Sequence, residues 1–428
     1  MTKSIATLIA VGTRGDVQPY IALGKGLQWA GLNVRVLTTP DFRSLATQYG
    51  LEFHQIFDMD VEAVMQSDNA KAILETKNPL TMLRRLIEFC RPWFHEALDN
   101  MLKALDGAAV GIFSSVAQFG GYEACEKLNI PAVFTFLQPV LPMNEMASPF
   151  FPAMPAIFGQ GVYNRVTHHI ATQTIWQLFR PIVNDTRVNR LGLEKIPLAG
   201  SWRSIKKLKL PVMMGYSPKV LPPSANWHEN IHVPGYWFLD EPEEWSPPPD
   251  LAEFLASGKP PIYIGFGSMA NRAPEKNTQI IVDALVRSGE RGLLSTGWGG
   301  LQNGSLPDTI FKLESCPHSW LFPRMKAIVH HGGAGTTAAA FRAGRPQIVV
   351  PFFADQPFWG KLTQQLGVGV QPLPNKTITV ESLASAMKQV ASNPEIQQKA
   401  RELGQTIRAE DGIGNAVKII KQIIATEA

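Results

Sequence analysis

The chain has 428 residues, a length that suits two globular domains better than one. Apolar residues make up 45% of it and charged residues 18%, which excludes an intrinsically disordered chain. The net charge is +4 and no long basic run occurs, so no nucleic-acid partner is expected.

The three cysteines, Cys90, Cys125 and Cys316, lie far apart and show no CxxC or Cys/His ligand spacing. Neither a zinc site nor a disulfide framework is indicated, and a reducing compartment fits. The chain runs from "MTKS" directly into a strand-like segment, without a leader pattern, and holds no uninterrupted apolar window of about 18 residues. We therefore expect a cytoplasmic protein without a spanning helix.

The first half alternates between strands and helices. A continuous apolar run over residues 5–12 predicts a buried strand, and a glycine-bearing turn follows it. A helix is predicted from about Gln18 to Gly31, with Pro19 in its first turn. Further strands are predicted over residues 33–39, 109–115 and 131–138. Because βαβ units build parallel sheets, we expect a doubly wound α/β domain.

The pattern weakens between Pro139 and Gly235 and restarts after an acidic, proline-rich stretch, "FLDEPEEWSPPPD". Strands are predicted over 260–268, 327–333 and 346–353, and helices between them imply a second parallel sheet. The predicted organisation is a first domain over 1–237, a linker over 238–250, a second domain over 251–408, and a terminal helix over 409–428 that packs back on the first domain.

The segment "HHGGAGTTAAAFRAGRP" places a strand end, a glycine turn and a helix start in succession. Glycines let backbone approach a ligand closely, and a helix N-terminus offers unpaired N–H groups and a positive dipole end, which together favour phosphate. An imidazole from His330 or His331 would add a hydrogen-bond donor. The alternative is a tight structural connection, and the motif alone leaves both interpretations open.

Other polar residues follow predicted strands. Asp355 and Gln356 stand at a strand's carboxyl end, where ligands bind in open parallel sheets, and Ser268 ends the first strand of the second half. Asp16 occupies the matching place in the first half, where its functional role would be that of a general base. For Asp16 and Asp355 the alternative is a helix cap, and for Ser268 it is a turn serine.

Four stretches together resemble the nucleotide-sugar-dependent glycosyltransferases of GT-B architecture. They are "GTRGDVQPYIALG", "GFGSM", "CPHSWLFPRMKAIVHHGGAGTTAAAFRAGRP" and "VPFFADQPFWG", and they are most similar to the sterol glucosyltransferase branch, with glycopeptide-antibiotic glycosyltransferases as close relatives. The resemblance implies two Rossmann-like domains that face each other across a cleft, with the donor site in the second.

The resemblance also implies roles for individual residues. His330 would contact the donor's diphosphate, Ser268 would reach the β-phosphate, and Asp355 and Gln356 would hold sugar hydroxyls. Ser315 replaces the tryptophan that stacks on uracil in many plant relatives, so other residues would form the nucleotide site. The candidates that would bind the nucleotide or diphosphate are Trp298, the backbone of Pro317 and His318, and the turn and helix-end residues Gly332, Gly333, Ala334, Gly335 and Thr336.

The implied reaction is inverting transfer of a hexose, with glucose preferred, from a UDP-sugar to a hydroxyl of a lipophilic acceptor such as a sterol or terpenoid. Asp16 would act as the base, and no metal or cofactor would be required. The triplet Asp58–Asp60 mimics a metal-binding DxD and is interpreted as coincidence. The apolar middle region suits such an acceptor and a peripheral membrane contact.

Three alternatives stay open. The first is a glycosyltransferase of natural-product aglycones that uses a dTDP- or UDP-sugar. The second is a sugar-nucleotide epimerase, which needs no acceptor. The third is a non-catalytic binding partner, in which the intact "DQ" and "HHGGAG" motifs would be unexpected.

Overall fold

The computed structural model describes residues 4–58, 67, 72–73, 76, 78–152, 159–200, 209–241, 245–266, 274–295, 306–352 and 354–427. The chain divides into two compact units. Unit 1 comprises Met1–Leu239 and Asp411–Ala428, and unit 2 comprises Asp240–Glu410. The predicted linker over 238–250 spans the first boundary between them.

Unit 1 is built on a parallel sheet with the strand order β3-β2-β1-β4-β5-β6-β7. Leu8 of the central strand pairs with Val36 on one side and Ile112 on the other. The strands are β1 Ile5–Ile9, β2 Asn33–Thr38, β3 Glu52–Gln55, β4 Val110–Phe113, β5 Ala132–Phe136, β6 Val212–Met214 and β7 Ile231–His232. The strands β1, β4 and β5 are short and almost wholly buried, which explains why continuous apolar runs predicted them.

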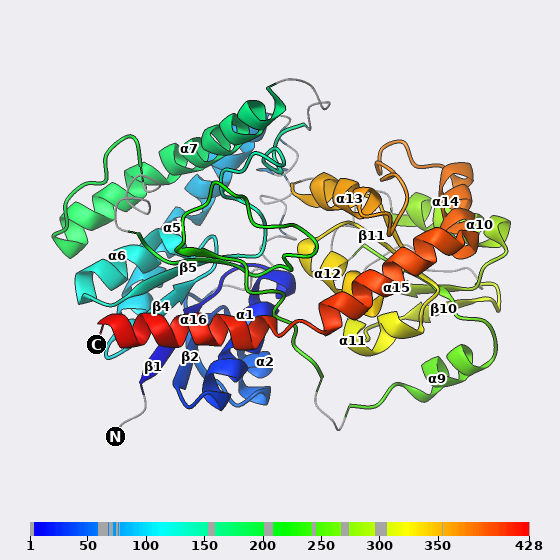
Figure 1. Ribbon diagram of the computed structural model, residues 1–428, viewed down its shortest axis with the longest axis horizontal. Helices are drawn as coiled ribbons and strands as arrows, with labels where there is room; N and C mark the ends of the chain where they lie inside the picture. The colour runs from blue at the N-terminus through cyan, green and yellow to red at the C-terminus, as the bar shows by residue number, and fades with distance from the viewer. Residues whose placement is uncertain are drawn as a thin grey trace. The chain divides into compact units, whose positions relative to one another are not determined.

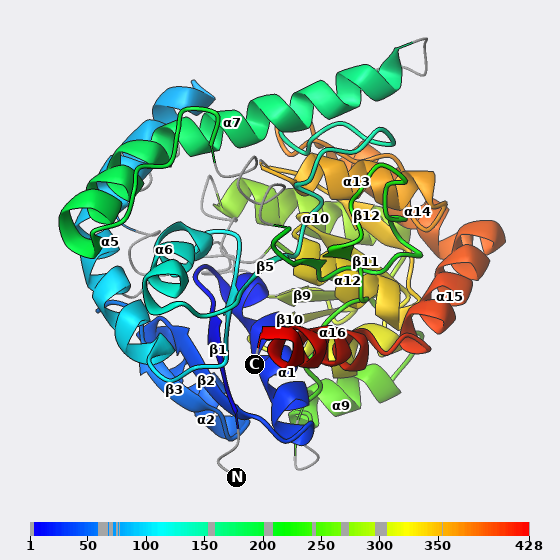
Figure 2. The ribbon, with the colours of Figure 1, turned by 60° about the vertical axis from the view of Figure 1, so that its left-hand side comes forward.

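Helices cover both faces of this sheet, because successive strand residues point to opposite sides. Leu8 packs with the helices α1 (Arg14–Trp29) and α16 (Gly412–Glu427), whereas Ile9 packs with α5 (Pro79–Leu105). The terminal helix α16 lies along α1, where Gly26 leaves room for Ile413 (Figures 1 and 2). The remaining helical segments of unit 1 are η1 Pro40–Phe42, α2 Arg43–Gln48, α6 Gln118–Leu128, α7 Gln160–Thr186 and its π-helical extension η2 Arg187–Leu191.

Helix α1 begins at Arg14, so the predicted start near Gln18 was wrong, and Pro19 lies inside the helix rather than in its first turn. The reason is a polar cap that a search for apolar periodicity overlooks. Thr13 is the N-cap. The Asp16 side chain, three residues later, accepts a hydrogen bond from the backbone N–H of Thr13 at 2.8 Å. Asp16 is therefore a first-turn helical residue.

Unit 2 contains a second parallel sheet with the order β10-β9-β8-β11-β12. Its strands are β8 Ile262–Gly265, β9 Gly292–Ser295, β10 Ile310–Leu313, β11 Ala327–His330 and β12 Gln347–Val349. One face packs against α10 (Pro274–Ser288) and α14 (Val380–Ser392), and the other against α9 (Pro249–Ala256), α11 (His318–Leu321) and α12 (Ala334–Ala343). The predicted fold class, two α/β domains with parallel sheets, is confirmed.

Three further helical segments complete unit 2: η4 Phe322–Arg324, α13 Gln356–Gln365 and α15 Pro394–Arg408. Helix α15 approaches the end of α12 closely, since a Cβ on Gly404 would lie 2.5 Å from the Cα of Gly344 (Figure 1). Helices α12 and α13 are the next elements after β11 and β12, so their N-termini lie at the carboxyl edge of the sheet.

Candidate functional site

The glycine turn between β11 and α12 packs against the start of α13. Gly332 has φ +90°, and a Cβ there would lie 2.7 Å from the Val349 side chain and 2.9 Å from the carbonyl oxygen of Gln356. Only glycine fits this conformation and this spacing. The structure therefore brings the "HHGGAG" and "DQP" motifs together at one edge of unit 2.

His330 ends β11 and is completely buried. Its Nδ1 accepts the backbone N–H of Gly332 at 3.1 Å, and its Nε2 lies 2.8 Å from Gln347 Oε1. Burial, assisted by the nearby His331, lowers the pKa of His330 to about 3, so the ring is neutral at physiological pH. Direct contact between His330 and a ligand would require one of these hydrogen bonds to break. Its role at a diphosphate stays a prediction.

His331 is the second imidazole that the sequence left open. It is partly buried, and its Nε2 lies against Gly333, where a Cβ would be only 2.5 Å away. Among the described residues, its Nδ1 is buried and has no hydrogen-bond partner. Burial lowers the pKa of His331 to about 4. A neutral imidazole with an unsatisfied nitrogen thus borders the N-cap of α12.

The first turn of α12 consists of Ala334, Gly335 and Thr336, and its N-cap Gly333 has no side chain with which to cap it. The first N–H groups of a helix have no intrahelical acceptors. Together with the dipole they form a site for an anion. Gly332 differs from these residues, because its N–H is already donated to His330.

Asp355 and Gln356 begin α13 after a strained residue, Ala354, which has φ +54°. Asp355 is partly exposed, and its Oδ2 accepts the indole N–H of Trp359 at 2.8 Å. Gln356 is buried, and its Oε1 accepts the backbone N–H of Phe352 at 2.8 Å. The loop therefore fixes both predicted sugar ligands in place, and their contacts with a sugar stay predictions.

The predicted nucleotide residues Pro317 and His318 follow β10, the strand at the far edge of the same sheet. The His318 ring stacks on Phe322 at 4.1 Å between ring centroids, and its Nε2 lies 3.5 Å from the hydroxyl of Tyr263. Ser268 and Trp298 lie outside the described residues. Sequence reasoning missed Gln347, whose only signal was a polar residue at the start of an apolar strand.

Asp16 occupies the corresponding position in unit 1. Its Oδ2 accepts hydrogen bonds from the backbone N–H of Thr13 at 2.8 Å and from the Thr13 hydroxyl at 2.9 Å. Within the described residues, Oδ1 has no partner. Burial raises the pKa of Asp16, and the two Thr13 bonds oppose that rise. Asp16 is thus a helix cap that uses only one of its carboxylate oxygens among the residues that the structure describes.

Gly12 makes room for this carboxylate. Its φ is +142°, and a Cβ at that position would lie 2.5 Å from Asp16 Oδ2. The glycine before the helix is therefore needed for the position of the Asp16 side chain as well as for the turn.

Among the residues that the structure describes, no three His, Cys, Asp or Glu side chains gather in a way that would hold a metal ion. Asp60 of the DxD-like triplet lies outside them. In the same part of the chain, no helix is both long and apolar enough to cross a bilayer.

Two family profiles match the chain: the glycosyltransferase family 28 N-terminal domain over residues 6–95, and the C-terminal domain of erythromycin biosynthesis protein CIII-like proteins over residues 299–423. The solved glycosyltransferase of kitacinnamycin superimposes with a TM-score of 0.72 at 17% identity, covering 99% of this chain and all of that one. The calicheamicin glycosyltransferase CalG4 gives 0.70 at 16% identity, covering 99% of each chain. The chain therefore has the two-domain GT-B fold of these glycosyltransferases and matches glycosyltransferase-type profiles in both of its halves.

Within this class the chain is similar to sterol 3-beta-glucosyltransferases. The enzyme of Arabidopsis thaliana is 34% identical over 422 residues, which are 96% of this chain and 64% of that protein. The enzyme of Pichia angusta is 36% identical over 429 residues, which are 97% of this chain and 33% of that protein. The chain therefore spans less than two thirds of the length of these relatives.

Proposed function

We propose that this protein transfers glucose from UDP-glucose to the hydroxyl of a sterol or a similar lipophilic alcohol, with inversion at the anomeric carbon. The observation that carries the proposal is its 34% identity, over 96% of the chain, to a sterol 3-beta-glucosyltransferase. The structure of each unit supports the proposal. The sheet edge of unit 1 holds the Asp16 carboxylate, and the sheet edge of unit 2 holds the N-terminus of α12, which suits an anion.

Asp16 is the proposed general base. Its Oδ1 would take the proton of the acceptor hydroxyl while the acceptor oxygen forms a bond to the anomeric carbon and the bond from that carbon to the diphosphate breaks. UDP leaves from the opposite face, so the configuration inverts. A carboxylate with the ordinary pKa near 4 is a weak base towards an alcohol, and the raised pKa of Asp16 makes it a stronger one.

The departing diphosphate would be stabilised by the first turn of α12 and by His331. Stabilising the charge of the leaving group is usually the largest single contribution to catalysis of this kind. His331 is better placed than His330 for direct contact, because its Nδ1 is unsatisfied among the described residues. Asp355 and Gln356 would bind the hydroxyls of the transferred sugar. This arrangement needs no metal, so activity should survive a chelator such as EDTA.

A screen of donors against acceptors tests the proposal. Purified protein is incubated with UDP-glucose or dTDP-glucose and with cholesterol, ergosterol, a terpenoid alcohol or a phenol, and products are read by mass spectrometry. We expect a gain of one hexose on the sterols with UDP-glucose. Products only with phenols or with the dTDP-sugar would favour a natural-product glycosyltransferase, and a sugar-nucleotide isomer formed without acceptor would identify an epimerase.

We also propose that unit 1 contacts a membrane surface through the outer face of α7. Val162, Val166 and Ile170 are spaced by four residues on that face and are 45–68% exposed. The exposed Leu198 continues the same face, because its carbonyl oxygen accepts hydrogen bonds from Gln173 and Gln177 at 2.8 Å each. Sterols reside in membranes, so such a face would bring the protein to its acceptor.

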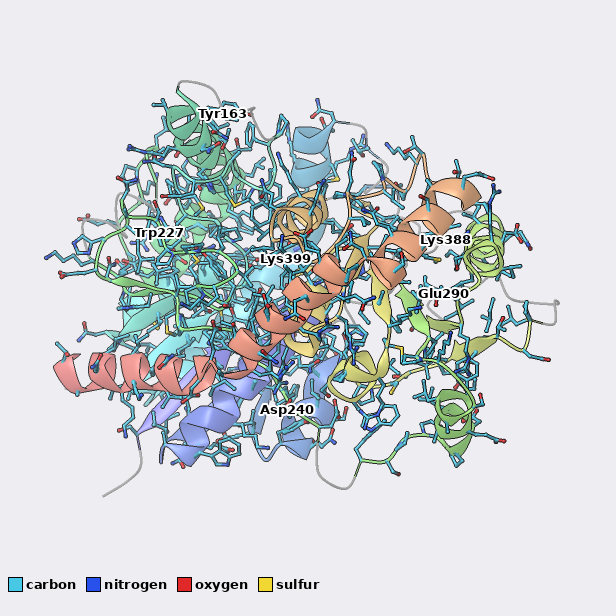
Figure 3. All side chains as sticks on the ribbon, turned by 45° about the vertical axis from the view of Figure 1, so that its right-hand side comes forward. Tyr163, Trp227, Asp240, Glu290, Lys388 and Lys399 are labelled. Carbon is cyan, nitrogen blue, oxygen red and sulfur yellow. The ribbon has the colours of Figure 1, made fainter. Side chains whose placement is uncertain are left out.

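A further exposed apolar residue, Phe150, lies in a segment that is hydrogen-bonded to the same helix. Tyr163, near the start of α7 (Figure 3), donates its hydroxyl to the Pro152 carbonyl at 2.8 Å, and the Ser148 backbone N–H is donated to Thr167 Oγ1 at 2.9 Å. The exposed Arg165 lies between Val162 and Val166, and no acidic residue occurs in α7 before Asp185. This charge distribution favours an anionic lipid surface.

Sedimentation with vesicles of phosphatidylcholine and phosphatidylglycerol tests this contact. We expect the double variant Val166→Asp/Ile170→Asp to lose most of its vesicle binding. The control is Val286→Asp on α10, an exposed valine in unit 2, which should bind like the wild type. Equal binding by all three proteins would contradict the proposed surface.

A further inference from the structure

The pair formed by His330 and Gln347 is a buried polar connection between two apolar strands. His330 is the last residue of β11 and Gln347 the first of β12, and both are completely buried. The strands pair in register, Val329 with Ile348 and His330 with Val349. The glycine turn that would bind the sugar donor begins at Gly332, two residues after His330.

The hydrogen bonds of this pair fix where its protons lie. A backbone N–H can only donate, so the bond from Gly332 to His330 Nδ1 requires Nδ1 to be unprotonated. A neutral imidazole then carries its proton on Nε2, which donates to Gln347 Oε1. The two hydrogen bonds therefore point the same way along the chain of groups. The Gly332 N–H donates to His330 Nδ1, and His330 Nε2–H donates to Gln347 Oε1.

The connection is retained although it leaves a polar group unsatisfied. In the described part of the chain, the Nε2 amide of Gln347 is buried and has no hydrogen-bond partner. An orphaned buried donor is unfavourable, and an apolar residue of similar size would avoid it. What the glutamine supplies is an acceptor for His330, and through His330 a fixed position for the Gly332 N–H.

The Gly332 turn is tightly packed. It carries a positive φ and touches both Val349 and the backbone of Gln356, so a rotation of its peptide would shift the start of α12 relative to the start of α13. Any group that fixes this turn would therefore also set where the starts of α12 and α13 lie relative to each other.

We propose that Gln347 is a positioning residue of the donor site, which acts through His330 to hold the Gly332 turn in its binding conformation. This rests on the proposed function, since it assumes that the turn binds a sugar diphosphate. His330 is then a positioning residue as well, and the direct contact with phosphate falls to His331 and the amides of α12.

The test combines spectroscopy with nucleotide binding. Protein labelled with ¹⁵N at its nine histidines reports the tautomer of each ring through its two-bond ¹H–¹⁵N correlations, and loss of one set of peaks in Gln347→Leu identifies His330. In the wild type the His330 ring should be neutral, protonated on Nε2, and should not titrate between pH 5 and 8; His331 should also stay neutral in that range, so the response to Gln347→Leu distinguishes the two rings. Calorimetric titration with UDP should give a Kd about tenfold higher for Gln347→Leu, because a displaced turn misplaces several contacts together.

Two control variants separate positioning from loss of stability. Ile348→Val lies on the same strand and removes one core methyl group, so it should lower the melting temperature without changing the Kd for UDP. Gln347→Glu keeps an oxygen acceptor at the same reach but adds a buried carboxylate beside Nε2, so it should raise the pKa of His330; a His330 signal unchanged in this variant would show that residue 347 does not act through His330. If Gln347→Leu fails to fold, the His330 tautomer in the wild type and the His330 signal in the Glu variant still test the proposed positioning role.

A His330 ring protonated on Nδ1 would overturn the proposal. So would a folded Gln347→Leu that loses the His330 signal yet binds UDP like the wild type. Wild-type protein that shows the expected His330 signal but binds no UDP would instead contradict the proposed function, and the positioning role with it.

Discussion

The substitution Gly12→Ala tests how the Asp16 carboxylate is held. The new Cβ would lie 2.5 Å from Asp16 Oδ2 and 2.7 Å from its Cγ, at a φ of +142°. Backbone strain of this kind costs about 1–3 kcal/mol, and displacing the carboxylate breaks two hydrogen bonds from Thr13 worth roughly 1 kcal/mol each. We expect unit 1 to lose about 3–5 kcal/mol, which corresponds to a fall of roughly 10 °C in Tm.

The same substitution should lower glucosyl transfer at least about 100-fold, the smallest effect expected when a general base is misplaced. The matched control is Gly15→Ala, where the nearest atom to the new Cβ is the Thr13 hydroxyl at 3.8 Å and the residue already lies in α1. Differential scanning fluorimetry and a radiolabelled UDP-glucose assay measure both effects. A Gly12→Ala protein with the Tm and turnover of Gly15→Ala would refute this reasoning.

Three further substitutions probe other parts of the account. Thr13→Val removes a hydroxyl donor that lowers the pKa of Asp16, so the pKa should rise and the acid limb of the kcat/KM profile should move to higher pH; an unchanged or lower limb would contradict the assignment of that limb to Asp16. His331→Asn should raise the Kd for UDP about tenfold in calorimetry, roughly the effect of one lost hydrogen bond to a charged group, and an unchanged Kd would remove His331 from the site. Arg187→Met should destabilise unit 1 by about 3–5 kcal/mol in chemical denaturation, because it leaves the buried Glu123 without its cation. Its control, Arg190→Met, breaks only the more exposed pair with Asp99 and should cost about 1 kcal/mol or less; equal losses would argue against a buried ion pair.

The strands and the two-domain organisation could be predicted because they depend on local sequence patterns. Residues 5–12 are apolar apart from Thr7, and a short run of this kind is typical of a strand buried on both faces of a parallel sheet. The start of α1 was misplaced because it depends on a polar pair, Thr13 and Asp16, that the apolar pattern does not register.

The candidate site was only partly predictable for a physical reason. The sequence shows that two histidines precede the glycine turn, but which of them is buried depends on how β11 pairs with β12. Gln347 lies 17 residues from His330 in the chain, and only that pairing brings its amide to the imidazole. Hydrogen-bond partners across strands are set by register, which no local pattern specifies.

The most direct test of the account compares transfer and nucleotide binding in Asp16→Asn. The asparagine keeps the size of the side chain and removes the basic oxygen. We predict that this variant forms no detectable steryl glucoside from UDP-glucose while it binds UDP with the affinity of the wild type. A variant that kept most of its turnover would show that another group removes the acceptor proton.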